Sequence, residues 1–515
     1  MTGPQITRVS LKMISALVGL CLVTACVPDD ATGGAGTRTL TWSTGAALGT
    51  LDVVADQVNG TARRLLLGSV VEGLTKVEND HDKLSWSPLL ATSWKRVAPT
   101  RWRFELRRDV SFHDGSAMTA DDVAYSINKL TSPSSAKDST LANIAGAKVV
   151  DDYTVDVTTK LPDFYVFRTV AAIGVQPDGW GKDKAKAQNT AVGTGPYEVG
   201  EVTPAHDQTT LKIFPKYWGD AKPYYQNVVM KVIPDTGARL AGLQAGEADV
   251  AFDLSPDLLA AAPATISAAS TETDILRISD ASKALKDERV RQALNYAVDR
   301  STLIKSVRFG FALPPKGQGV SQQVHGYNPG LQDYPYDMTK AAQLVREAGA
   351  TGTKLTMMCV SEYYGTVGTD TCQTLASAYN KIGLDVKVQL LPREQWIEQG
   401  LLAPQNHIPP PDLFYVQAGS GTLDSTLYIQ NYFTCGDVRA TFCDEQLKKA
   451  SEDAIDLKDE SDQAKAYQKV HALAHDLAPI VWITSPKNAV ATQSGIDGKL
   501  YSDAYTTYWY EWKGK

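Results

Sequence analysis

The 515-residue chain is long enough for two or three domains. Hydrophobic residues make up 43% and charged residues 21%, which is ordinary for a globular protein. The formal charge of −7, with no basic stretch interleaved with aromatic residues, argues against nucleic acid as a main partner.

The N-terminus has the pattern of an export signal. Arg8 and Lys12 precede an apolar stretch at residues 13–23, which ends in Val-Thr-Ala-Cys26. This ending resembles a bacterial lipobox, so we expect residues 1–25 to be a lipoprotein signal peptide and Cys26 to carry lipid. A plain secretory peptide with an incidental cysteine is the alternative. The apolar stretch has about 11 residues, whereas a membrane span needs roughly 20.

The segment after Cys26 is polar and glycine-rich. Its sequence, VPDDATGGAGTR, predicts a flexible tether over residues 26–38. A diacylated cysteine anchors stably because it carries more than one chain. We therefore expect the protein on the extracytoplasmic face of the cell membrane, held by its lipid.

Residues 88–130 predict a strand, a tight turn and a capped helix. Trp102, Phe104 and Leu106 alternate with charged residues, as in a half-buried strand. A Phe-His-Asp-Gly-Ser turn follows, whose glycine is free to take a positive φ. Thr119 then offers a helix cap, followed by acidic residues at the positive end of the helix dipole.

Four groups of residues in this run also form a longer pattern. They are Leu90-Ala91-x-Ser93-Trp94, Trp102-x-Phe104-x-Leu106-Arg107, Phe112-His113-Asp114-Gly115 and Thr119-Ala120-Asp121-Asp122-Val123. The pattern resembles the family 5 extracellular solute-binding proteins of ABC importers, which include oligopeptide, dipeptide and nickel receptors. One departure is Ala117-Met118, because the family usually has proline and a second apolar residue at these positions. A turn tolerates this change.

The resemblance covers nearly the whole chain after the tether. Further matching segments are Gly49-Thr50-Leu51-Asp52, Val71-Glu72-Gly73-Leu74, Gly193-Thr194-Gly195-Pro196-Tyr197, Tyr217-Trp218-Gly219, Gly246-Glu247-Ala248-Asp249-Val250 and residues 287–300. The glycines at 193 and 195 predict a sharp reversal that other residues would resist.

Hydrophobic periodicity predicts the other elements. Strands are expected over residues 39–42, 228–233, 354–360, 386–391, 412–418 and 478–483, a hairpin over 149–158, and helices over 62–74, 238–245, 339–348, 451–458 and 464–477. The clearest helix is residues 287–300, which Asp287 can cap and whose apolar stripe begins at Val290. The strands at 354–360 and 386–391 flank a helix ending near Gly383, as in a βαβ unit.

The resemblance implies an α/β protein with the two-lobed periplasmic-binding-protein type II fold, in which mixed sheets are flanked by helices. In this family the chain crosses between lobes. We therefore expect lobe I to hold residues 39–265 and 485–515, with an extra subdomain at about 53–190. Lobe II would hold residues 266–484.

Four of the six cysteines follow the signal and the lipid site. In an exported protein an even number suggests disulfides. Three pairings are open, and we predict Cys359–Cys372 and Cys435–Cys443, which join nearest neighbours. A metal site is the rival interpretation, but no Cys-x-x-Cys spacing supports it.

The sequence shows no enzymatic constellation such as His-Glu-x-x-His, Gly-x-Ser-x-Gly or a phosphate-binding loop. Ser134-Ser-Ala-Lys137 matches the Ser-x-x-Lys of penicillin-recognising enzymes, but no Lys-Thr-Gly accompanies it.

His471 and His475 could form a metal pair on one helix face. With no third ligand evident, two histidines on a polar face is the better interpretation. His113 fits a structural role in its turn. We expect no enzyme activity, no cofactor and no metal.

The ligand should bind in a cleft between the lobes, where small-molecule sites usually lie. Aromatic side chains there supply apolar contact and polar edges. The candidate ligand-binding residues are Trp42, Ser43, Thr44, Tyr363, Tyr364, Trp396, Tyr415, Gln417, Ala418, Gly419, Trp482 and Tyr505. Burial in the core is an equally good interpretation of any single tryptophan or tyrosine among them.

One segment departs from the family pattern where the ligand is recognised. Peptide-binding members carry an aspartate, in a Trp-x-x-Asp-x-x-Asp-Pro segment, that pairs with the free amino group of the peptide. The alignment with residues 416–424 places Val416 at the tryptophan and Gly419 at the aspartate. A charge pair in a closed cleft is hard to replace. Either Asp424 takes the role from a shifted position or the ligand lacks a free amine.

The resemblance implies a monomeric receptor that binds a peptide or another small solute and delivers it to an ABC permease with its ATPase subunits. Sugars, opine-like compounds and nickel chelates stay open as ligands. One alternative function is a ligand sensor that signals to another membrane partner. A secreted hydrolase is a further alternative, but it needs a nucleophile–base pair that we do not find.

Overall fold

The computed structural model describes residues 38–54, 60–80, 83–132, 141, 143–361, 365–402, 408–420, 423–435, 439–501 and 506–514. The predicted signal peptide, Cys26 and all but the last residue of the tether lie outside these ranges. Arg38–Lys515 form one compact unit. Among the described residues, no helix is both long enough and apolar enough to cross a membrane.

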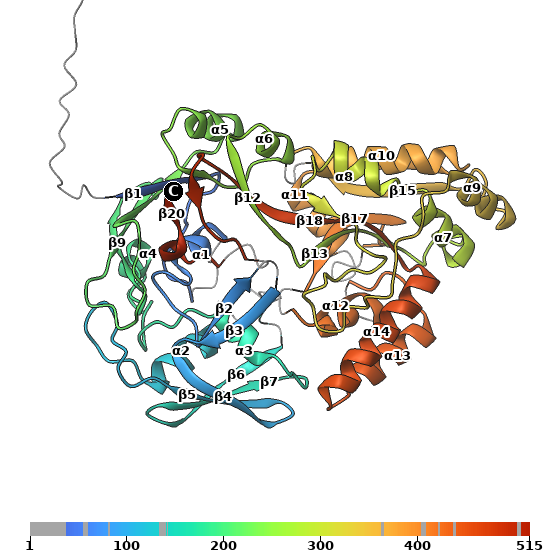
Figure 1. Ribbon diagram of the computed structural model, residues 1–515. Helices are drawn as coiled ribbons and strands as arrows, with labels where there is room; N and C mark the ends of the chain where they lie inside the picture. The colour runs from blue at the N-terminus through green and yellow to red at the C-terminus, as the bar shows by residue number, and fades with distance from the viewer. Residues whose placement is uncertain are drawn as a thin grey trace, which may run out of the picture. The chain divides into compact units, whose positions relative to one another are not determined.

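Twelve strands join in one mixed sheet of order β16-β15-β17-β13-β18-β11-β1-β10-β9-β8, and β12 and β14 also pair with β18 (Figure 1). The first strand group consists of β1 (Thr39–Thr44), β8 (Tyr197–Val202), β9 (Gln208–Ile213), β10 (Asn227–Val232), β11 (Val250–Ala251) and β12 (Ala264–Ala269). The second strand group consists of β13 (Glu272–Ile278), β14 (Ala312–Leu313), β15 (Lys354–Val360), β16 (Asp385–Leu391) and β17 (Leu413–Gly419).

Strand β18 (Ile480–Thr492) belongs to both groups. Its first residues pair with β13, its middle with β14, and its last residues with β12 and β11. The predicted strand ended at residue 483, which is wrong. Pro486 lacks an N–H and therefore resembles a strand breaker in sequence. In the structure it stays within the strand, and its carbonyl accepts a bond from Ser270 N at 3.3 Å.

Strand β17 of the second strand group is buried on both faces. Leu413 and Tyr415 of β17 face a core formed with α7 (Glu288–Tyr296), α9 (Met338–Glu347) and α10 (Val367–Lys381). Phe414 and Val416 face a core formed with α12 (Ser425–Phe433), α13 (Glu445–Ile455) and α14 (Glu460–Leu477). A strand that is covered by helices on both sides usually has a nearly continuous apolar sequence, as β17 does. The predicted βαβ unit is confirmed, since β15 and β16 pair in parallel around α10.

A smaller sheet of order β4-β5-β7-β6 holds the segment that first resembled the family. Its strands are β4 (Ala91–Ala98), β5 (Arg101–Leu106), β6 (Ile144–Asp151) and β7 (Thr154–Thr159), with α2 (Ala120–Leu130) beside them and the hairpin β2 (Thr75–Asp80) and β3 (Lys83–Pro88) nearby. Trp102, Phe104 and Leu106 are buried, as predicted. The cap is confirmed, because the Asp122 carboxylate accepts bonds from Thr119 N at 2.8 Å and Thr119 Oγ1 at 3.2 Å.

Three of the family-like segments meet at the buried side chain of Glu72. Its carboxylate accepts bonds from Thr194 Oγ1 at 2.8 Å, Tyr217 OH at 2.8 Å and Trp218 Nε1 at 3.1 Å. Burial raises the pKa of Glu72 to about 7, although these bonds favour the ionised form. Widely separated segments are thereby tied to one buried acid.

The glycines at 193 and 195 lie at a bend of the chain at residues 194–196 and permit close packing there. Neither takes a positive φ. A Cβ atom at Gly193 would lie 2.1 Å from Val70 O, and one at Gly195 would lie 2.3 Å from Ser69 O. His113 belongs to the same contact and has the structural role predicted for it, since its Nε2 lies 2.9 Å from Gly195 O.

Three helix predictions need correction. The helix predicted over 287–300 ends at Tyr296, because Asp299 caps a second helix, α8 (Arg300–Ser306), by accepting from Thr302 N at 3.0 Å. The helix predicted over 62–74 is α1 (Gly60–Leu66), since Gly68 takes φ +84°. The helix predicted over 451–458 is α13, which begins and ends earlier.

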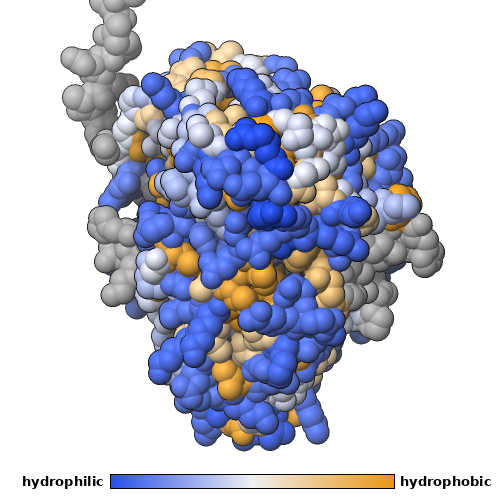
Figure 2. Space-filling view, turned by 90° about the vertical axis from the view of Figure 1, so that its right-hand side faces the viewer, coloured by the Kyte–Doolittle hydropathy of each residue, from blue (hydrophilic) through white to orange (hydrophobic). Residues whose placement is uncertain are grey.

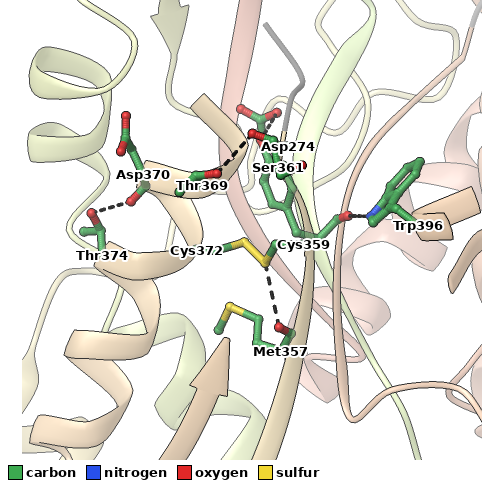
Figure 3. The surroundings of a disulfide bond; sticks show 10 residues. Asp274, Met357, Cys359, Ser361, Thr369, Asp370, Cys372, Thr374 and Trp396 are labelled. Atoms are coloured by element: carbon green, nitrogen blue, oxygen red, sulfur yellow. Dashed lines mark hydrogen bonds between the residues drawn. A yellow bond between two sulfur atoms is a disulfide. The ribbon is translucent and has the colours of Figure 1, made fainter. Parts of the chain in front are cut away.

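Both predicted disulfides are present. Cys359 in β15 bonds Cys372 in α10, so the helix is tied to the strand that precedes it (Figure 3). Cys435 bonds Cys443 between α12 and α13. Cys435, Cys443 and Glu445 are the group of described side chains close enough to hold a metal, but the two sulfurs are already bonded to each other.

The remaining elements are α3 (Val166–Thr169), α4 (Lys184–Asn189), α5 (Thr236–Gln244), α6 (Pro256–Ala260), α11 (Arg393–Trp396) and the short pair β19 (Ile496–Asp497) and β20 (Lys513–Gly514). Figure 2 shows the face of this unit that lies to the right in Figure 1; hydrophilic side chains dominate it, with smaller hydrophobic patches between them. The division into lobes at residues 265/266 and 484/485 stays a prediction.

Candidate ligand-binding site

A pocket lies where the two strand groups meet at β18, and we call it the crossover pocket. Its cavity volume is about 100 Å³, and it is partly open to solvent. The residues that line it are Arg64, Phe252, Asp253, Leu254, Pro256, Leu259, Glu272, Arg308, Phe311, Gln417, Pro486, Lys487, Asn488, Ala489, Val490 and Leu500. They come from both strand groups and from the strand that joins them.

The carboxylate of Asp274 organises the wall that the second strand group provides. Asp274 Oδ1 accepts bonds from Tyr415 OH at 3.1 Å and Gln417 Nε2 at 3.0 Å. Its Oδ2 accepts from Thr484 Oγ1 at 2.5 Å and forms an ion pair with Arg308. Asp274 is only 1% exposed, so these partners replace the water that would otherwise surround its carboxylate. The same contacts hold the side chains of Gln417 and Arg308 in the pocket wall.

Asp253 plays a similar part in the wall from the first strand group. Its carboxylate accepts from Thr44 Oγ1 at 2.7 Å and pairs with Arg64 Nη1 at 3.3 Å. Burial acts to raise the pKa of Asp253, but Arg64 and Thr44 hold it below its ordinary value. The Arg64 guanidinium also lies 4.4 Å from the centre of the Phe252 ring. Both charges are therefore satisfied before any ligand binds.

Glu272 differs from these two acids because its carboxylate has no partner. Its side chain makes no hydrogen bond or ion pair with a described residue. Burial and the nearby charge of Asp274 raise the pKa of Glu272 to about 7, although Arg308 acts to lower it. Glu272 therefore changes its charge close to neutral pH.

Two further polar groups in the pocket are unsatisfied within the described residues. Lys487 N donates to Phe311 O at 3.0 Å, but the Lys487 ammonium has no ion pair or hydrogen bond there. Gln417 Oε1 is buried and accepts no bond. The pocket thus offers an unpaired carboxylate, an unpaired ammonium and a free amide oxygen.

The segment of α3 contacts residues that pack with the second strand group at a different place. Tyr165 OH lies 2.8 Å from His325 Nδ1 and also donates to Glu460. Arg168 Nη1 donates to Leu423 O at 2.6 Å. Burial lowers the pKa of His325 to about 4. This polar contact is a second tie between the parts of the chain that β18 joins.

Of the predicted ligand-binding residues, Gln417 lines the crossover pocket. Thr44 and Tyr415 support its acids, and Gly419 pairs with Glu272 in the β13–β17 ladder. Tyr363, Tyr364 and Tyr505 lie outside the described residues.

The other candidates lie in hydrophobic cores and not in the pocket wall. Trp42 is fully buried and stacks on Trp509 with ring centroids 5.2 Å apart, and Ser43 is buried next to it. Trp482 is 1% exposed, Ala418 is buried, and Trp396 stacks on Phe414 with ring centroids 5.0 Å apart. Their contribution to ligand binding stays a prediction.

Asp424 does not provide the displaced carboxylate in this pocket. It is buried as the cap of α12, where it accepts from Thr426 N at 2.8 Å.

The predicted pair of histidines on a polar face is also wrong, because His471 is buried and contacts Ser425 Oγ at 3.2 Å. His475 instead lies 3.1 Å from Gln332 O.

The sequence analysis missed Arg64, Asp253, Glu272, Arg308 and Lys487. The sequence does contain an indication of one of these residues, Glu272. Glu272 and Asp274 stand two apart at the start of an apolar strand, so they share a face of the sheet. Two acids on one face of a buried strand need partners or a ligand. No short-range pattern indicated that Lys487 would come to the same place.

The comparisons with known proteins agree with this architecture. The glutathione-binding protein GsiB of Salmonella choleraesuis (strain SC-B67) is 31% identical over 255 residues, which cover 47% of this chain and 49% of the relative. The matched region is therefore about half the length of that relative. A putative peptide-binding protein AppA from Clostridium difficile superposes with a TM-score of 0.80 at 18% identity, covering 93% of this chain and 100% of that chain.

A further solved structure is the periplasmic binding protein DppA from Helicobacter pylori in complex with the peptide STSA. It superposes with a TM-score of 0.71 at 20% identity and covers 93% of this chain and 98% of that one. Fold and pocket together define a two-lobed α/β binding protein, which confirms the predicted fold class. The chain belongs to the bacterial extracellular solute-binding proteins of family 5, whose model matches residues 85–440.

Asp274→Asn should lower the free energy of unfolding by about 3–5 kcal/mol, because it removes the buried carboxylate that forms an ion pair with Arg308. Thr484→Val removes one hydrogen bond to the same carboxylate and should cost only about 1 kcal/mol. Urea unfolding of both variants checks this order. Equal losses would show that the ion pair does not stabilise the wall.

Glu272→Gln should change how stability depends on pH. The pKa of Glu272 in the folded protein, about 7, exceeds its ordinary value of 4.5, so the folded protein keeps a proton that the unfolded chain loses. Stability therefore decreases as pH rises from 4.5 towards 7 and above. The variant should gain melting temperature relative to the wild type at pH 8 but not at pH 4. The exposed Glu247→Gln is the control, and the same difference at both pH values would contradict the shift.

Proposed function

We propose that this protein is an extracytoplasmic receptor that binds a small solute and delivers it to an ABC importer. The observation that carries the proposal is the crossover pocket, whose walls come from both strand groups. A ligand in such a pocket contacts both parts of the protein at once. Its binding energy then favours the arrangement in which the two walls are close.

The lobes would divide as the sequence predicts, near residues 265/266 and 484/485. In support, the chain passes from the first strand group to the second between β12 and β13, and β18 passes between them in the same region. These two segments would form the hinge of a closing motion. The bonds of Tyr165 and Arg168 would form only when the lobes are close.

A peptide or a peptide-like compound is the ligand class that we propose. The names of similar proteins include a glutathione-binding protein and a complex with the peptide STSA. The polar groups in the pocket wall are able to orient such a molecule, and Phe252, Leu254 and Phe311 supply apolar contact. The receptor would act with a permease and ATPase subunits and without chemistry on its ligand.

Ligand binding should raise the melting temperature and leave the ligand unchanged. At a free concentration of 100 times Kd the stabilisation is about 2.7 kcal/mol. Ligand that co-purifies under native conditions can be released by denaturation, identified by mass spectrometry and added back in a thermal scan. Recovery of a chemically altered ligand after incubation would favour the hydrolase alternative and contradict the receptor.

We also propose that Cys26 carries the lipid that anchors the protein to the cell membrane. Cys26→Ala should move the protein from the membrane fraction to the soluble extracytoplasmic fraction, because it removes the sulfur that would carry the lipid. Fractionation and labelling with a radioactive fatty acid measure this. Cys21→Ala is the matched control, and unchanged membrane retention of Cys26→Ala would contradict lipidation.

A further inference from the structure

The polar contact made by α3 lies outside the crossover pocket. Its members are Tyr165, Arg168, His325, Leu423 and Glu460, and we call it the α3 contact. None of the five lines the pocket. A ligand in the pocket and the α3 contact therefore join the same two parts of the protein at separate places.

One side of the α3 contact is fixed to the smaller sheet. The Phe167 ring stacks on Trp94 with ring centroids 5.6 Å apart, and it meets Trp86 edge to face at 6.0 Å. Phe167 lies between Tyr165 and Arg168 in the sequence. The two side chains that reach across therefore move with the smaller sheet.

The other side is fixed to the helices that pack with the second strand group. His325 N donates to Leu423 O at 2.9 Å, and Ser425 Oγ donates to His325 O at 2.7 Å. Ser425 is the first residue of α12, and Glu460 is the first residue of α14. The groups that meet Tyr165 and Arg168 thus move with these two helices.

Four polar interactions form the α3 contact. Tyr165 OH donates to the Glu460 carboxylate, so its oxygen accepts from His325 Nδ1, which lies 2.8 Å away. Arg168 Nη1 donates to Leu423 O at 2.6 Å, and the Arg168 guanidinium lies 3.7 Å from the centre of the Tyr165 ring. Hydrogen bonds to charged groups are stronger than those between neutral ones. All of these interactions require α3 to lie against the second side.

We propose that Tyr165 and Arg168 form a latch that sets how often the two lobes close and how long the closed protein retains its solute. The inference rests on the proposed receptor function and adds a control of the closing step. Because the latch does not line the pocket, it acts only through the fraction of protein that is closed, and it raises the affinity for every solute by the same factor.

Two titratable groups in the latch exchange protons in opposite directions when it closes. His325 Nε2 is buried without a hydrogen-bond partner among the described residues. Burial and the nearby charge of Arg168 lower the pKa of His325 to about 4. On the other side, burial and the charge of Asp424 raise the pKa of Asp163 to about 6. The charged and titratable groups that face these two are Arg96, Tyr165, Arg168, Asp424, Glu460 and Tyr467.

The two proton exchanges offset each other. If both groups have their ordinary pKa in the open form, closing releases a proton from His325 and adds one to Asp163. His325 alone would make closing less favourable as pH falls below 6.5, and Asp163 alone would make it more favourable as pH falls below 6. Closing of the intact latch therefore depends little on pH.

The test uses the full chain with spin labels at Lys148→Cys and Lys465→Cys, which are exposed on the smaller sheet and on α14. Double electron–electron resonance gives the ratio of short to long label distances, without ligand and with trialanine as the probe. Tyr165→Phe should lower this ratio about 10-fold, because it removes both hydrogen bonds of the phenol. Trialanine should dissociate faster by the same factor. The exposed Tyr336→Phe is the matched control.

Two further readouts separate a latch from a purely structural role. The Kd values of trialanine and trileucine should rise by one common factor in Tyr165→Phe, because the pocket is unchanged. Asp163→Asn should make closing depend on pH, since the proton of His325 is no longer offset. The distance ratio should then fall about 20-fold from pH 7 to pH 5, against about 2- to 3-fold in the wild type.

An unchanged distance ratio in Tyr165→Phe, or different factors for the two peptides, would overturn the latch and leave a solute receptor. Equal pH profiles of the wild type and Asp163→Asn would contradict the proton exchange within it. No binding of either peptide, together with no co-purified ligand by mass spectrometry, would overturn the proposed function, and the ligand-free distance ratio would still decide on the latch. If Tyr165→Phe unfolds, Arg168→Gln is the second variant, because it removes the bond to Leu423 O.

Discussion

The structure depends on one strand, β18, that is shared by the two strand groups of the large sheet. β18 hydrogen-bonds to β13 at its beginning and to β12 and β11 at its end. These backbone hydrogen bonds satisfy the N–H and C=O groups of β18 and tie both strand groups to this one strand. Everything that lies beside the middle of β18, including the crossover pocket, is therefore bordered by both strand groups. Relative movement of the groups must be taken up at this strand and at the β12–β13 connection.

The charges around the pocket fall into two kinds with different consequences. Asp253 and Asp274 are neutralised by arginines and hydroxyl donors, so they stabilise the walls and position the groups that face the ligand. Glu272 and Lys487 have no side-chain partner among the described residues, and burial of the Glu272 carboxylate carries a desolvation cost that a ligand of matching charge would remove. A binding protein can tolerate such unpaired groups, since the energy lost in the empty pocket is recovered when the ligand binds.

The segments that most clearly identify the family do not line the pocket. The strand, turn and helix at 88–130 form the core of a smaller sheet, and the Glu-Gly-Leu, Gly-Thr-Gly-Pro-Tyr and Tyr-Trp segments meet at Glu72. Gly193 and Gly195 are required because backbone atoms of Ser69 and Val70 leave no room for a side chain. These residues preserve a scaffold, whereas the crossover pocket is lined by residues such as Glu272 and Lys487, which belong to no recognisable pattern.

Local sequence determined much of the scaffold, because strands, helix caps and nearest-neighbour disulfides depend on residues close together in the chain. Trp102, Phe104 and Leu106, the Asp122 cap and the pair Cys359–Cys372 show this. Local patterns could not tell a buried tryptophan from one that contacts ligand, so Trp42 and Trp482 were placed in the candidate site although both lie in cores. Only the tertiary structure brought Glu272, Gly419 and Lys487 to one pocket, because their proximity arises from the pairing of β13 with β17 and of β12 with β18 over long sequence separations.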